Sequence, residues 1–499
     1  MQIIIPMSGF GERFRKAGYN IPKPLIKVHD KTIIEYVINL FPKENNFIFI
    51  CNKDHLKNIK FNMRDILKKI SPKSKIVSIN PHKLGPVHAI LKAKKYIKLD
   101  KPTIVNYADF TCYWDYKKFK KFALNKKTNF DGVIPSYKDF HPHTIWNNYY
   151  AYLKLNKKNL LEDIREKKPF TKDPVKEFAS SGTYFFKNGK MMIQYFEKMI
   201  KEKIIVNKEY YVSMAYKPMI KDSKKIAAYN LDHFMQWGTP KDLNEYLYWS
   251  NCFIALTKKS KTLKLPGYTI IPMAGKGLRF IKDGYKKPKP IIPVSGKELI
   301  FQVLDDLPIT TNNILVVRDN NTHNLLLNNK RQILRKNTKI IKLNRNTSGQ
   351  ASTCLIGCRD INNYQPITFA ACDNGMIYNE KKFLNFFNDK KIDIIVWGAR
   401  GYPGAYRQPN MYGWISTYRN SNKIKKISVK KQLKDPYSDP VVLGTFTFKN
   451  KQIFTESFRE LKKNKKKINN EYYLDSCINE AINLKYNCYY FEVDYYLCW

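Results

Sequence analysis

The sequence repeats itself, and this repeat constrains the fold more than any other feature of the chain. Residues 6–24 read PMSGFGERFRKAGYNIPKP, and residues 272–290 read PMAGKGLRFIKDGYKKPKP. Twelve of the nineteen aligned positions are identical, and no gap is needed. A repeat of roughly 235–250 residues is too long for a solenoid and has the size of one complete domain. The 499-residue chain is therefore predicted to hold two tandem copies of one domain.

The likeness between the copies continues in register beyond this motif. The offset drifts only from 266 to 262 over later pairs of identical residues, which are Gly85 with Gly349, Asp109 with Asp373, Lys167 with Lys430, Glu209 with Glu471 and Asp232 with Asp494. A lysine-rich stretch at 258–261 and the Pro266-Gly267 pair are typical of a connection. We expect the first domain at residues 1–250, a linker at 251–266 and the second domain at 267–499.

Short strands rich in Ile, Val and Phe alternate with helical stretches in each copy. An apolar strand precedes each glycine-rich motif, an amphipathic helix follows it, and a second apolar strand comes next. This alternation indicates an α/β fold, with βαβ units on a largely parallel sheet. Ligands bind such sheets beyond the carboxyl ends of the strands, so the glycine-rich turn lies where a binding site is expected.

Composition excludes several classes of protein. A content of 43% apolar and 14% aromatic residues rules out global disorder. The sequence has no apolar run of the ~18 residues that a membrane-spanning helix needs, and its N-terminus lacks the features of a signal peptide. The nine cysteines are scattered and include no Cys-x-x-Cys pair, so a zinc site is not expected. We expect a reduced, cytoplasmic protein without a membrane span.

The net charge is +47, from 89 basic and 42 acidic residues. Such an excess usually suggests a polyanionic partner, nucleic acid first. The basic residues are spread along the whole chain, however, and no RRM, KH or zinc-finger signature occurs. Nucleic acid is therefore not expected as the main partner, and a phosphate-bearing small molecule would benefit from the same electrostatic field. The sequence leaves the oligomeric state open, and an oligomer is allowed.

The repeated motif carries groups that suit a triphosphate. Phe14 and Phe280 replace the third glycine of a dinucleotide fingerprint, and no GxxxxGK[ST] loop occurs. Instead, an arginine follows each glycine turn and a lysine stands between two prolines. Backbone N–H groups, a bidentate guanidinium and a point charge together can hold phosphate oxygens. A solvated basic loop is the alternative, and the return of the same basic residues in both copies speaks against it.

The pattern Gly-x-Gly-x-Arg-Phe followed by Pro-Lys-Pro resembles the nucleotidyltransferase family, which includes sugar-1-phosphate nucleotidylyltransferases and phosphocholine cytidylyltransferase-like enzymes. The resemblance covers essentially the whole chain, twice. It implies two tandem Rossmann-like (GT-A-type) domains with mostly parallel mixed sheets. It also implies that a substrate phosphate attacks the α-phosphorus of a nucleoside triphosphate, with Mg2+ bridging the phosphates and pyrophosphate leaving. By resemblance, the triphosphate is held by Gly9, Gly11, Arg13 and Lys23 in the first copy and by Gly275, Gly277, Arg279 and Lys289 in the second, the arginines and lysines being catalytic.

One acid ends an apolar strand in each copy. Asp109 and Asp373 agree with the metal-binding aspartate of the family, and Mg2+ commonly takes one or two carboxylates plus phosphate oxygens. A turn or helix-cap role is the alternative. The family's later aspartate precedes a Gly-Thr pair, where this sequence has Gln236. Asp232 and its counterpart Asp494 are therefore expected as second metal ligands, with a single metal as the alternative.

The acceptor half of each copy has its own candidates. Lys167 resembles the lysine of the family's Glu-Lys segment, which contacts the substrate phosphate, and Lys430 is its counterpart without the glutamate. Gly182 and Gly444 match a family strand near the acceptor. Glu209 and Glu471 recur in the same half, where a helix-capping role is the alternative.

The copies differ where the nucleobase would bind. The second has Gly349-Gln350-Ala351, close to the base-reading segment of the family, in which the glutamine amide can pair with the base. The first has Gly85 followed by proline, which lacks an amide donor and a backbone N–H. The second copy reaches Trp499 before any Gly-Thr-Pro, so its terminal segment is expected to be incomplete. Both copies are nevertheless expected to bind nucleotide.

These features predict a cytoplasmic, Mg2+-dependent enzyme that joins a nucleoside triphosphate to a phosphorylated small molecule, such as a sugar 1-phosphate. The NDP-linked product would serve as a precursor of a capsule or surface glycan, as the family implies. Two alternatives stay open. One is a glycosyltransferase that consumes NDP-sugars, and the other is a catalytically dead scaffold that binds nucleotide or nucleic acid.

Overall fold

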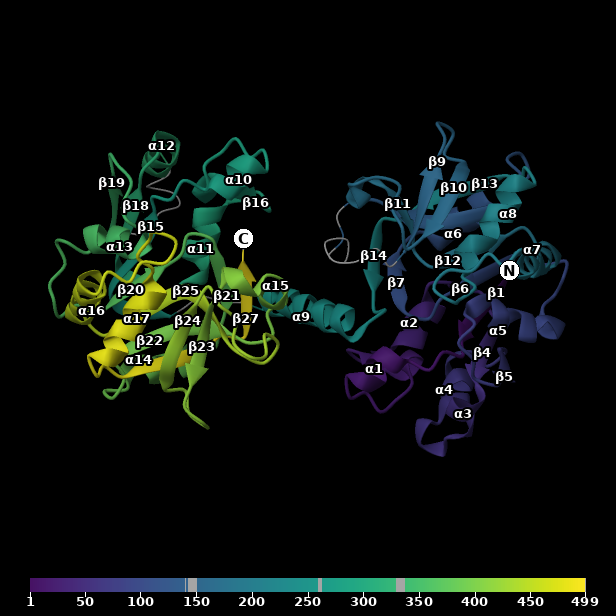
Figure 1. Cartoon of the computed structure of the whole chain (residues 1–499), viewed down its shortest axis with the longest axis horizontal. Coiled ribbons are helices and arrows are strands. Elements are labelled where there is room, and N and C mark those ends of the chain that lie inside the picture. Colours follow the sequence, from purple (N-terminus) through teal and green to yellow (C-terminus); the bar gives the residue numbers. More distant parts are fainter. Residues whose placement is uncertain (140, 142–149, 259–262, 329–336, 499) are drawn as a thin grey trace. The chain divides into compact units, whose positions relative to one another are not determined.

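The structure is a computed structural model that describes residues 1–139, 141, 150–258, 263–328 and 337–498. It divides into two compact units, Met1–Leu247 (unit 1) and Tyr248–Trp499 (unit 2), which are described separately (Figure 1). Helix α9 (Pro240–Thr257) contains the boundary between them. The two units contain the two copies of the repeat.

Unit 1 is built on a ten-stranded mixed sheet in the order β10-β9-β11-β8-β12-β6-β1-β4-β5, with β13 beside β8. Strands β5, β4, β1 and β6 run parallel to one another, and β13 runs parallel to β8. Strand β12 runs antiparallel to both of its neighbours, and the described strands of this sheet form five antiparallel and four parallel pairs, so the sheet is mixed. The strands are β1 (Gln2–Met7), β4 (Phe47–Asn52), β5 (Lys75–Ile79), β6 (Thr103–Asn106), β8 (Gly132–Tyr137), β9 (Ala151–Leu155), β10 (Leu161–Glu166), β11 (Phe178–Ser180), β12 (Thr183–Phe186) and β13 (Ile226–Asn230).

Helices cover both faces of this sheet (Figure 1). Alternate residues of β1 show why the strand is apolar throughout, since Ile3 and Ile5 belong to one core and Ile4 to the other. Helices α2 (Ile33–Asn39) and α6 (Tyr116–Ala123) pack into the first core, and α5 (Pro86–Lys92) and α7 (Gly189–Lys201) into the second. The remaining elements are α1 (Glu12–Lys16), η1 (Lys23–Leu25), β2 (Lys27–Val28), β3 (Lys31–Thr32), α3 (Lys53–Lys57), η2 (Ile59–Phe61), α4 (Met63–Ile70), η3 (Lys94–Tyr96), β7 (Phe110–Tyr113), η5 (Pro174–Lys176), η6 (Val212–Ala215), α8 (Tyr216–Lys221) and β14 (His233–Gln236).

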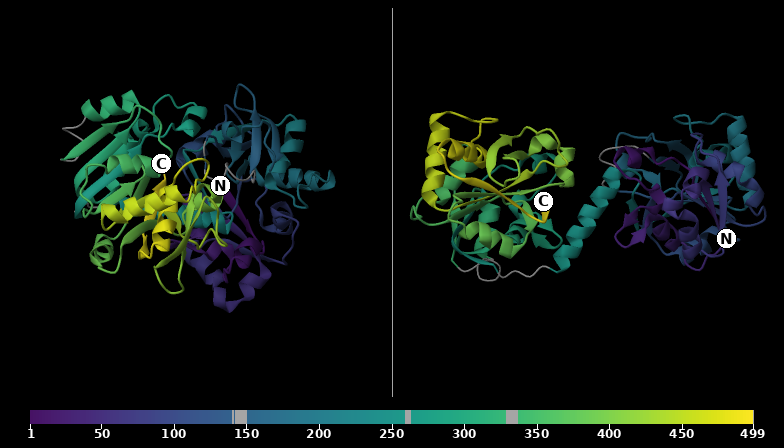
Figure 2. Two further views of the ribbon diagram at one scale, coloured as in Figure 1. Left: turned by 60° about the vertical axis from the view of Figure 1, so that its left-hand side comes forward. Right: turned by 90° about the horizontal axis from the view of Figure 1, so that it is seen from below.

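Unit 2 repeats this architecture around a nine-stranded sheet in the order β19-β18-β15-β20-β25-β22-β26 (Figure 2). Strand β23 pairs with β24 and β25, as the corresponding outer strands do in unit 1. The strands of the sheet are β15 (Lys264–Met273), β18 (Ile309–Val317), β19 (Thr338–Lys342), β20 (Ile367–Ala370), β22 (Ile394–Ala399), β23 (Gly413–Thr417), β24 (Ile424–Val429), β25 (Val441–Phe448) and β26 (Cys488–Glu492).

The sheet of unit 2 also lies between two cores. Ile271 packs with helix α11 (Leu299–Asp306) on one face, and Ile270 packs with α13 (Gln350–Gly357) on the other. The α/β fold expected from the sequence is thus confirmed in both units. The remaining elements are α10 (Leu278–Lys282), η7 (Lys289–Ile291), β16 (Pro293–Val294), β17 (Lys297–Glu298), α12 (Asn320–Asn328), β21 (Asn374–Ile377), α14 (Glu380–Asn388), α15 (Pro403–Arg407), η8 (Pro409–Met411), α16 (Lys451–Lys463), α17 (Leu474–Asn483) and β27 (Tyr495–Cys498).

The segment expected to be a linker, residues 251–266, differs from that expectation. Helix α9 continues to Thr257, and β15 begins at Lys264, while residues 259–262 lie outside the described part of the chain. Pro266 and Gly267 lie within β15, at a shift of register against β18. The Pro-Gly pair therefore marks an irregularity within a strand rather than a connection, which is a common use of these residues.

Two expectations from composition concern the whole chain. All nine cysteines belong to the described residues, and each is a free thiol. No helix in the described ranges is both long enough and apolar enough to cross a bilayer.

Candidate active sites

Each glycine-rich motif forms the turn from the first strand of a unit into a short helix. Gly11 precedes α1 with φ 64°, and Gly277 precedes α10 with φ 61°, a left-handed conformation that favours glycine. Gly9 and Gly275 differ, because their φ angles are not positive and a Cβ atom on either would meet nothing within 4 Å. Packing within the protein does not explain these two glycines. A glycine at such a place leaves the backbone open to close approach.

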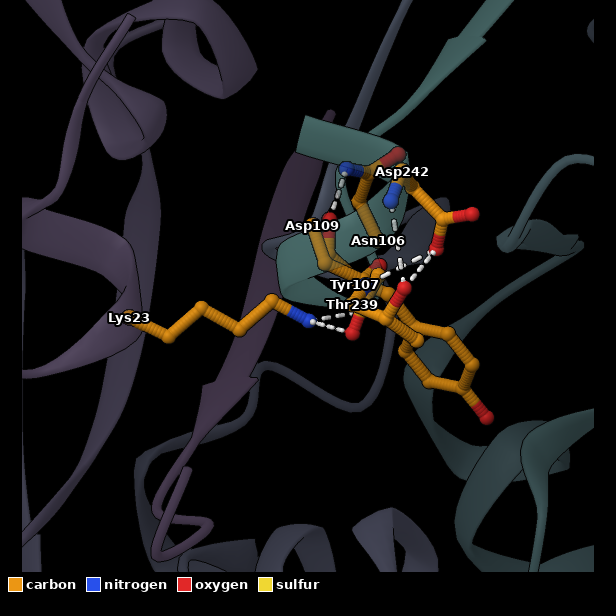
Figure 3. Close-up of polar contacts among 7 residues, drawn as sticks. Lys23, Asn106, Tyr107, Asp109, Thr239 and Asp242 are labelled. Atoms are coloured by element: carbon orange, nitrogen blue, oxygen red, sulfur yellow. Dashed lines mark hydrogen bonds and ion pairs between the residues drawn. The ribbon is translucent and has the colours of Figure 1, made fainter. Parts of the chain in front are cut away.

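The lysine between the two prolines reaches the acid beyond β6. Lys23 begins the 3-10 turn η1, and its Nζ lies 2.9 Å from Asp109 Oδ2 and 3.2 Å from the carbonyl oxygen of Gly238. Figure 3 shows the extended lysine side chain pointing at this group. In unit 2, Lys289 Nζ bonds Asp373 Oδ2 in the same way. The structure thus brings two of the predicted residues together in each unit.

The predicted second acid, Asp232, does not lie with Asp109. Strands β14 and β7 form an antiparallel ladder of four residue pairs, in which Gln236 faces Phe110, next to Asp109. Asp232 is exposed and lies beyond the other end of this ladder, roughly 13 Å away along the strand.

Asp494 occupies the corresponding place in unit 2. Its N–H donates to Ile377, the last residue of β21, whereas Asp373 precedes the first residue of that strand. Neither Asp232 nor Asp494 is therefore placed to share a metal with the acid after β6 or β20.

The acid that lies beside Asp109 is Asp242, which the sequence analysis missed. The Oδ2 atoms of Asp242 and Asp109 lie 3.7 and 3.8 Å from the point where a Cβ on Gly238 would stand. Asp242 Oδ2 also accepts hydrogen bonds from the N–H and the hydroxyl of Thr239, at 2.9 and 2.7 Å (Figure 3). Burial raises the pKa of Asp242. The Thr-x-x-Asp spacing at the start of α9 is a capping-box signal that could have found this residue.

A pocket of about 200 Å3 surrounds Asp109 in unit 1. Of the predicted residues, Arg13, Lys167 and Gly182 line it together with Asp109. Six of its seventeen lining residues are aromatic. Apart from the predicted residues, its lining residues include Tyr107, Phe110, Tyr150, Glu166, Tyr184, Tyr211, Phe234 and Asp242.

The lysines assigned to the acceptor phosphate share an unusual backbone. Lys167 has φ 59° and Lys430 has φ 55°, a left-handed conformation that is rare for residues with a side chain. Their N–H groups donate to equivalent carbonyl oxygens, of Tyr150 at 2.9 Å and of Tyr412 at 3.1 Å. The shared conformation and hydrogen bond show that the two lysines occupy equivalent places in the two units.

The ammonium groups of these lysines have different partners. Lys167 Nζ donates to the hydroxyl of Tyr211 at 2.5 Å, and Lys430 Nζ bonds the carbonyl oxygen of Met411. Burial lowers the pKa of Lys430, while nearby Asp475, Asp373 and Glu471 act in the opposite direction. The charges of the acid after β20 and of two further carboxylates therefore act on Lys430.

In unit 2 the predicted nucleotide-binding residues line one pocket of about 600 Å3. Seven predicted residues take part, namely Gly275, Gly277, Arg279, Lys289, Gly349, Gln350 and Glu471. In unit 1 the equivalent residues are divided, because Gly11 and Lys23 line a separate groove of about 850 Å3 with Asn52 and His55. Gly85 and Glu209 line neither that groove nor the pocket around Asp109.

Gly85 and Gly349 have a structural reason as well as a predicted role. Their φ angles are 87° and 119°, and a Cβ atom would lie 2.8 Å from the backbone nitrogen of Tyr210 or 2.6 Å from that of Tyr472. Each glycine lets its loop dock on that tyrosine. The docking sets Gln350 at the start of α13, where it lines the pocket of unit 2.

Gly182 and Gly444 have left-handed backbones at equivalent places in the antiparallel half of each sheet, Gly182 between β11 and β12 and Gly444 within β25. Their φ angles are 95° and 75°, and their carbonyl oxygens accept hydrogen bonds from the N–H groups of Tyr107 at 3.0 Å and Ala371 at 3.1 Å. Gly182 lies in the pocket around Asp109 because this bond brings its turn next to the end of β6.

The donor sets fit a hard divalent cation that is also held by phosphate. Within the described ranges, no group of three or more His, Cys, Asp and Glu side chains could hold a metal ion by protein ligands alone. Mg2+ commonly uses one or two carboxylates and completes its shell with water and substrate oxygens. Asp109 with Asp242 in unit 1, and Asp373 in unit 2, meet this requirement.

Comparison with known proteins gives one match to a family model. The nucleotidyl transferase family matches residues 2–249 and 268–495. A curated protein, the 2-C-methyl-D-erythritol 4-phosphate cytidylyltransferase of Wigglesworthia glossinidia brevipalpis, is 29% identical over 158 residues. That alignment covers 29% of this chain and 64% of the relative, which is less than two thirds of the relative's length.

The chain is also similar to solved structures. The nucleoside-diphosphate-sugar pyrophosphorylase from Vibrio cholerae RC9 is 17% identical with a TM-score of 0.40, over 49% of this chain and 99% of that chain. The CTP:phosphocholine cytidylyltransferase from Streptococcus pneumoniae is 18% identical with a TM-score of 0.37, over 49% of this chain and 97% of that chain.

Proposed function

The chain belongs to the nucleotidyl transferase family, and from this premise we propose that each unit transfers a nucleotidyl group from a nucleoside triphosphate to a phosphorylated small molecule, such as a sugar 1-phosphate. The acceptor phosphate attacks the α-phosphorus, the bond to the β-phosphate oxygen breaks, and pyrophosphate leaves. The observation that carries the proposal is the lysine–aspartate pair, Lys23 with Asp109 and Lys289 with Asp373, beside a glycine turn in both units.

The residues of each turn would supply positioning and charge, which are the main requirements of such a transfer. In unit 1, the backbone N–H groups near Gly9 and Gly11 would bind phosphate oxygens, and Arg13 and Lys23 would neutralise charge on the leaving pyrophosphate. Gly275, Gly277, Arg279 and Lys289 would do the same in unit 2. Asp109, Asp242 and Asp373 are the residues that would hold Mg2+, which would supply positive charge to neutralise the phosphates.

The acceptor would bind on the side of Asp109 or Asp373 that is opposite the glycine turn. Lys167 lies in the Asp109 pocket, and the charge of Asp373 acts on Lys430. A cation at this position would hold the attacking phosphate near the α-phosphorus, which reduces the entropy cost of the reaction. Glu209 and Glu471 stay candidates for acceptor contacts, and Glu471 lies in the pocket of unit 2.

The two units would read different nucleobases. The amide of Gln350 lines the pocket of unit 2 and can donate and accept hydrogen bonds with a base edge. Pro86 stands at the same place in unit 1, where it offers neither an amide nor an N–H group.

The proposal includes a cytoplasmic location and a product used for surface glycans. Nine free thiols suit a reducing compartment, and the glycan precursor is the part of the proposal that rests on the resemblance alone. The reaction, rather than its destination, is the first point to test.

The test is pyrophosphate release by the full chain with Mg2+, each of the four nucleoside triphosphates, and a panel of sugar 1-phosphates, phosphocholine and phosphoethanolamine. We expect release with at least one pair, reduced by Asp109→Asn or Asp373→Asn and abolished by both substitutions together. A glycosyltransferase would release no pyrophosphate from these mixtures. Release that the double variant leaves intact would contradict the proposed sites, and biological function without any release would favour a scaffold.

A further inference from the structure

The two units differ at the residue before the acceptor lysine. Glu166 precedes Lys167 at the end of β10, and Val429 precedes Lys430 at the end of β24. The strand registers show that the two positions are equivalent, because Glu166 pairs with Ala151 and Val429 pairs with Gly413. Unit 2 therefore lacks a carboxylate at the place on the strand where unit 1 has one.

A carboxylate enters the same region of unit 2 from a neighbouring element. In unit 1 the hydroxyl of Ser213 donates to Glu166 Oε2 at 2.5 Å. The repeat aligns Ser213 with Asp475, two residues after Tyr211 and Tyr473 respectively. The hydroxyl that supports the acid in unit 1 is thus replaced by an acid in unit 2.

Gly413 shows where the carboxylate of Asp475 lies. A Cβ atom on Gly413 would stand 2.5 Å from Asp475 Oδ2, a distance that would force the carboxylate to move. The φ angle of Gly413 is not positive, so its backbone does not itself require glycine. Ala151 occupies this position in unit 1, directly across the ladder from Glu166. The Asp475 carboxylate therefore lies against β23. In unit 2, β23 and β24 form the strand pair that corresponds to β9 and β10, the pair that carries Glu166 in unit 1.

Both carboxylates lie beside the acceptor lysine. Glu166 lines the pocket of Asp109 and Lys167, and Asp475 is the first of the groups whose charge opposes the burial of Lys430. Burial raises the pKa of Glu166 to about 7 and that of Asp475 to about 6, and the adjacent lysine partly offsets each shift. Burial of a carboxylate costs solvation free energy. The three differences between the units, Glu166 to Val429, Ser213 to Asp475 and Ala151 to Gly413, together keep a carboxylate beside the lysine in unit 2.

We propose that Asp475 is the acceptor-recognising carboxylate of unit 2 and takes the place that Glu166 has in unit 1. The inference rests on the proposed function. A carboxylate next to the lysine that holds the acceptor phosphate can receive hydrogen bonds from the other end of the same molecule. Both units would then select a small phosphorylated acceptor whose head group carries hydroxyl or ammonium hydrogen-bond donors. The pocket of about 200 Å3 in unit 1 suits a head group of that size.

The test uses the full chain with Asp109→Asn, which leaves unit 2 to be measured. Pyrophosphate release is followed with Mg2+ and each nucleoside triphosphate, and with glucose 1-phosphate, phosphoethanolamine or phosphocholine as the acceptor. The first carries hydroxyl donors, the second an ammonium donor, and the third neither. In this background, Asp475→Ser is expected to raise KM for the acceptor roughly 10- to 100-fold, the range for loss of a hydrogen bond to a charged group. KM for the nucleotide should stay within about twofold, because the carboxylate contacts only the acceptor.

A rescue variant separates recognition from a structural role. Gly413→Ala, Val429→Glu and Asp475→Ser together rebuild the arrangement of Ala151, Glu166 and Ser213, and this triple variant should recover most of the lost acceptor affinity. Unchanged acceptor KM in Asp475→Ser, phosphocholine as the preferred acceptor, or no recovery in the well-folded triple variant would each overturn the inference while leaving the proposed function in place. No pyrophosphate release from any pair in unit 2 would instead overturn the proposed function of that unit, and the inference with it.

Discussion

Lys23 and Asp109 are 86 residues apart in the sequence, yet they form an ion pair of 2.9 Å in unit 1. Lys289 and Asp373 repeat this pair in unit 2. In each pair the lysine and the carboxylate neutralise each other's charge in the absence of ligands. We expect the lysine to turn toward phosphate oxygens when the triphosphate binds, which frees the carboxylate for a metal.

Replacement of this lysine should cost activity rather than fold. Lys23→Met in the Asp373→Asn background removes a cation from the phosphate site, so kcat/KM for the nucleotide in unit 1 should fall about 100- to 1000-fold. The ion pair is partly exposed, and its loss should change the free energy of unfolding by only about 1 kcal/mol. Pyrophosphate release and urea unfolding measure the two effects.

Lys27→Met is the matched control for this change. Lys27 is exposed on β2, four residues further along the chain, and is expected to leave kcat/KM unaltered. An equal loss in both variants would mean that general surface charge, and not the Lys23–Asp109 pair, supports the reaction.

Asp242 and Asp232 give opposite predictions for the second acid. Asp242→Asn should lower kcat/KM in unit 1 about 10- to 100-fold, because the carboxylate lies beside Asp109. Asp232→Asn should have no measurable effect, since that side chain is exposed beyond the far end of the β7–β14 ladder. Initial rates at several Mg2+ concentrations would show whether Asp242→Asn raises the metal requirement. The reverse ranking of the two variants would restore Asp232 as the second ligand.

Two glycines of unit 2 should separate binding from stability. Gly275→Ala leaves packing intact, because the new Cβ meets nothing within 4 Å, so the fold should keep its stability while nucleotide affinity falls about tenfold. Gly349→Ala places a Cβ 2.6 Å from a backbone nitrogen at φ 119°, and should destabilise unit 2 by about 1–3 kcal/mol or more. Thermal unfolding and calorimetric titration of nucleotide distinguish the two outcomes. Equal destabilisation by both substitutions would show that Gly275 serves packing after all.

Glu166 should make unit 1 less stable as pH rises. Its pKa in the folded state is raised to about 7 by burial, from an ordinary value of 4.5, so the folded state holds the proton more tightly than the unfolded state. Protonation thus stabilises the fold below about pH 4.5, and this contribution, at most ~3 kcal/mol, is lost as the pH rises through 7. Glu166→Gln should remove the dependence between pH 5 and pH 8 in urea unfolding. Glu162→Gln, at an exposed position of the same strand, should retain it.

Much of the fold could be predicted because its signals are local. The apolar residues of β1 and β15, and the periodic helices that follow them, mark βαβ units by short-range pattern alone. Gly11 and Gly277 mark a turn for the same reason, since a left-handed residue is required there. The boundary between the domains was harder to predict. Pro266 and Gly267 have the composition of a loop, but they lie in β15, where a shift of register against β18 accommodates them.

The repeat in the sequence by itself determined the two α/β units and singled out Lys23 and Asp109 with their counterparts. Only the tertiary structure decided which other carboxylates lie beside them. Asp232 recurs in the repeat, but the antiparallel pairing of β14 with β7 places it at the far end of the ladder from Asp109. Asp242 lies beside Asp109 instead. In unit 2, the acid of the acceptor region lies on α17 rather than on a strand, at Asp475. The pairing of distant strands and helices sets these distances, and spacing along one chain does not encode that pairing.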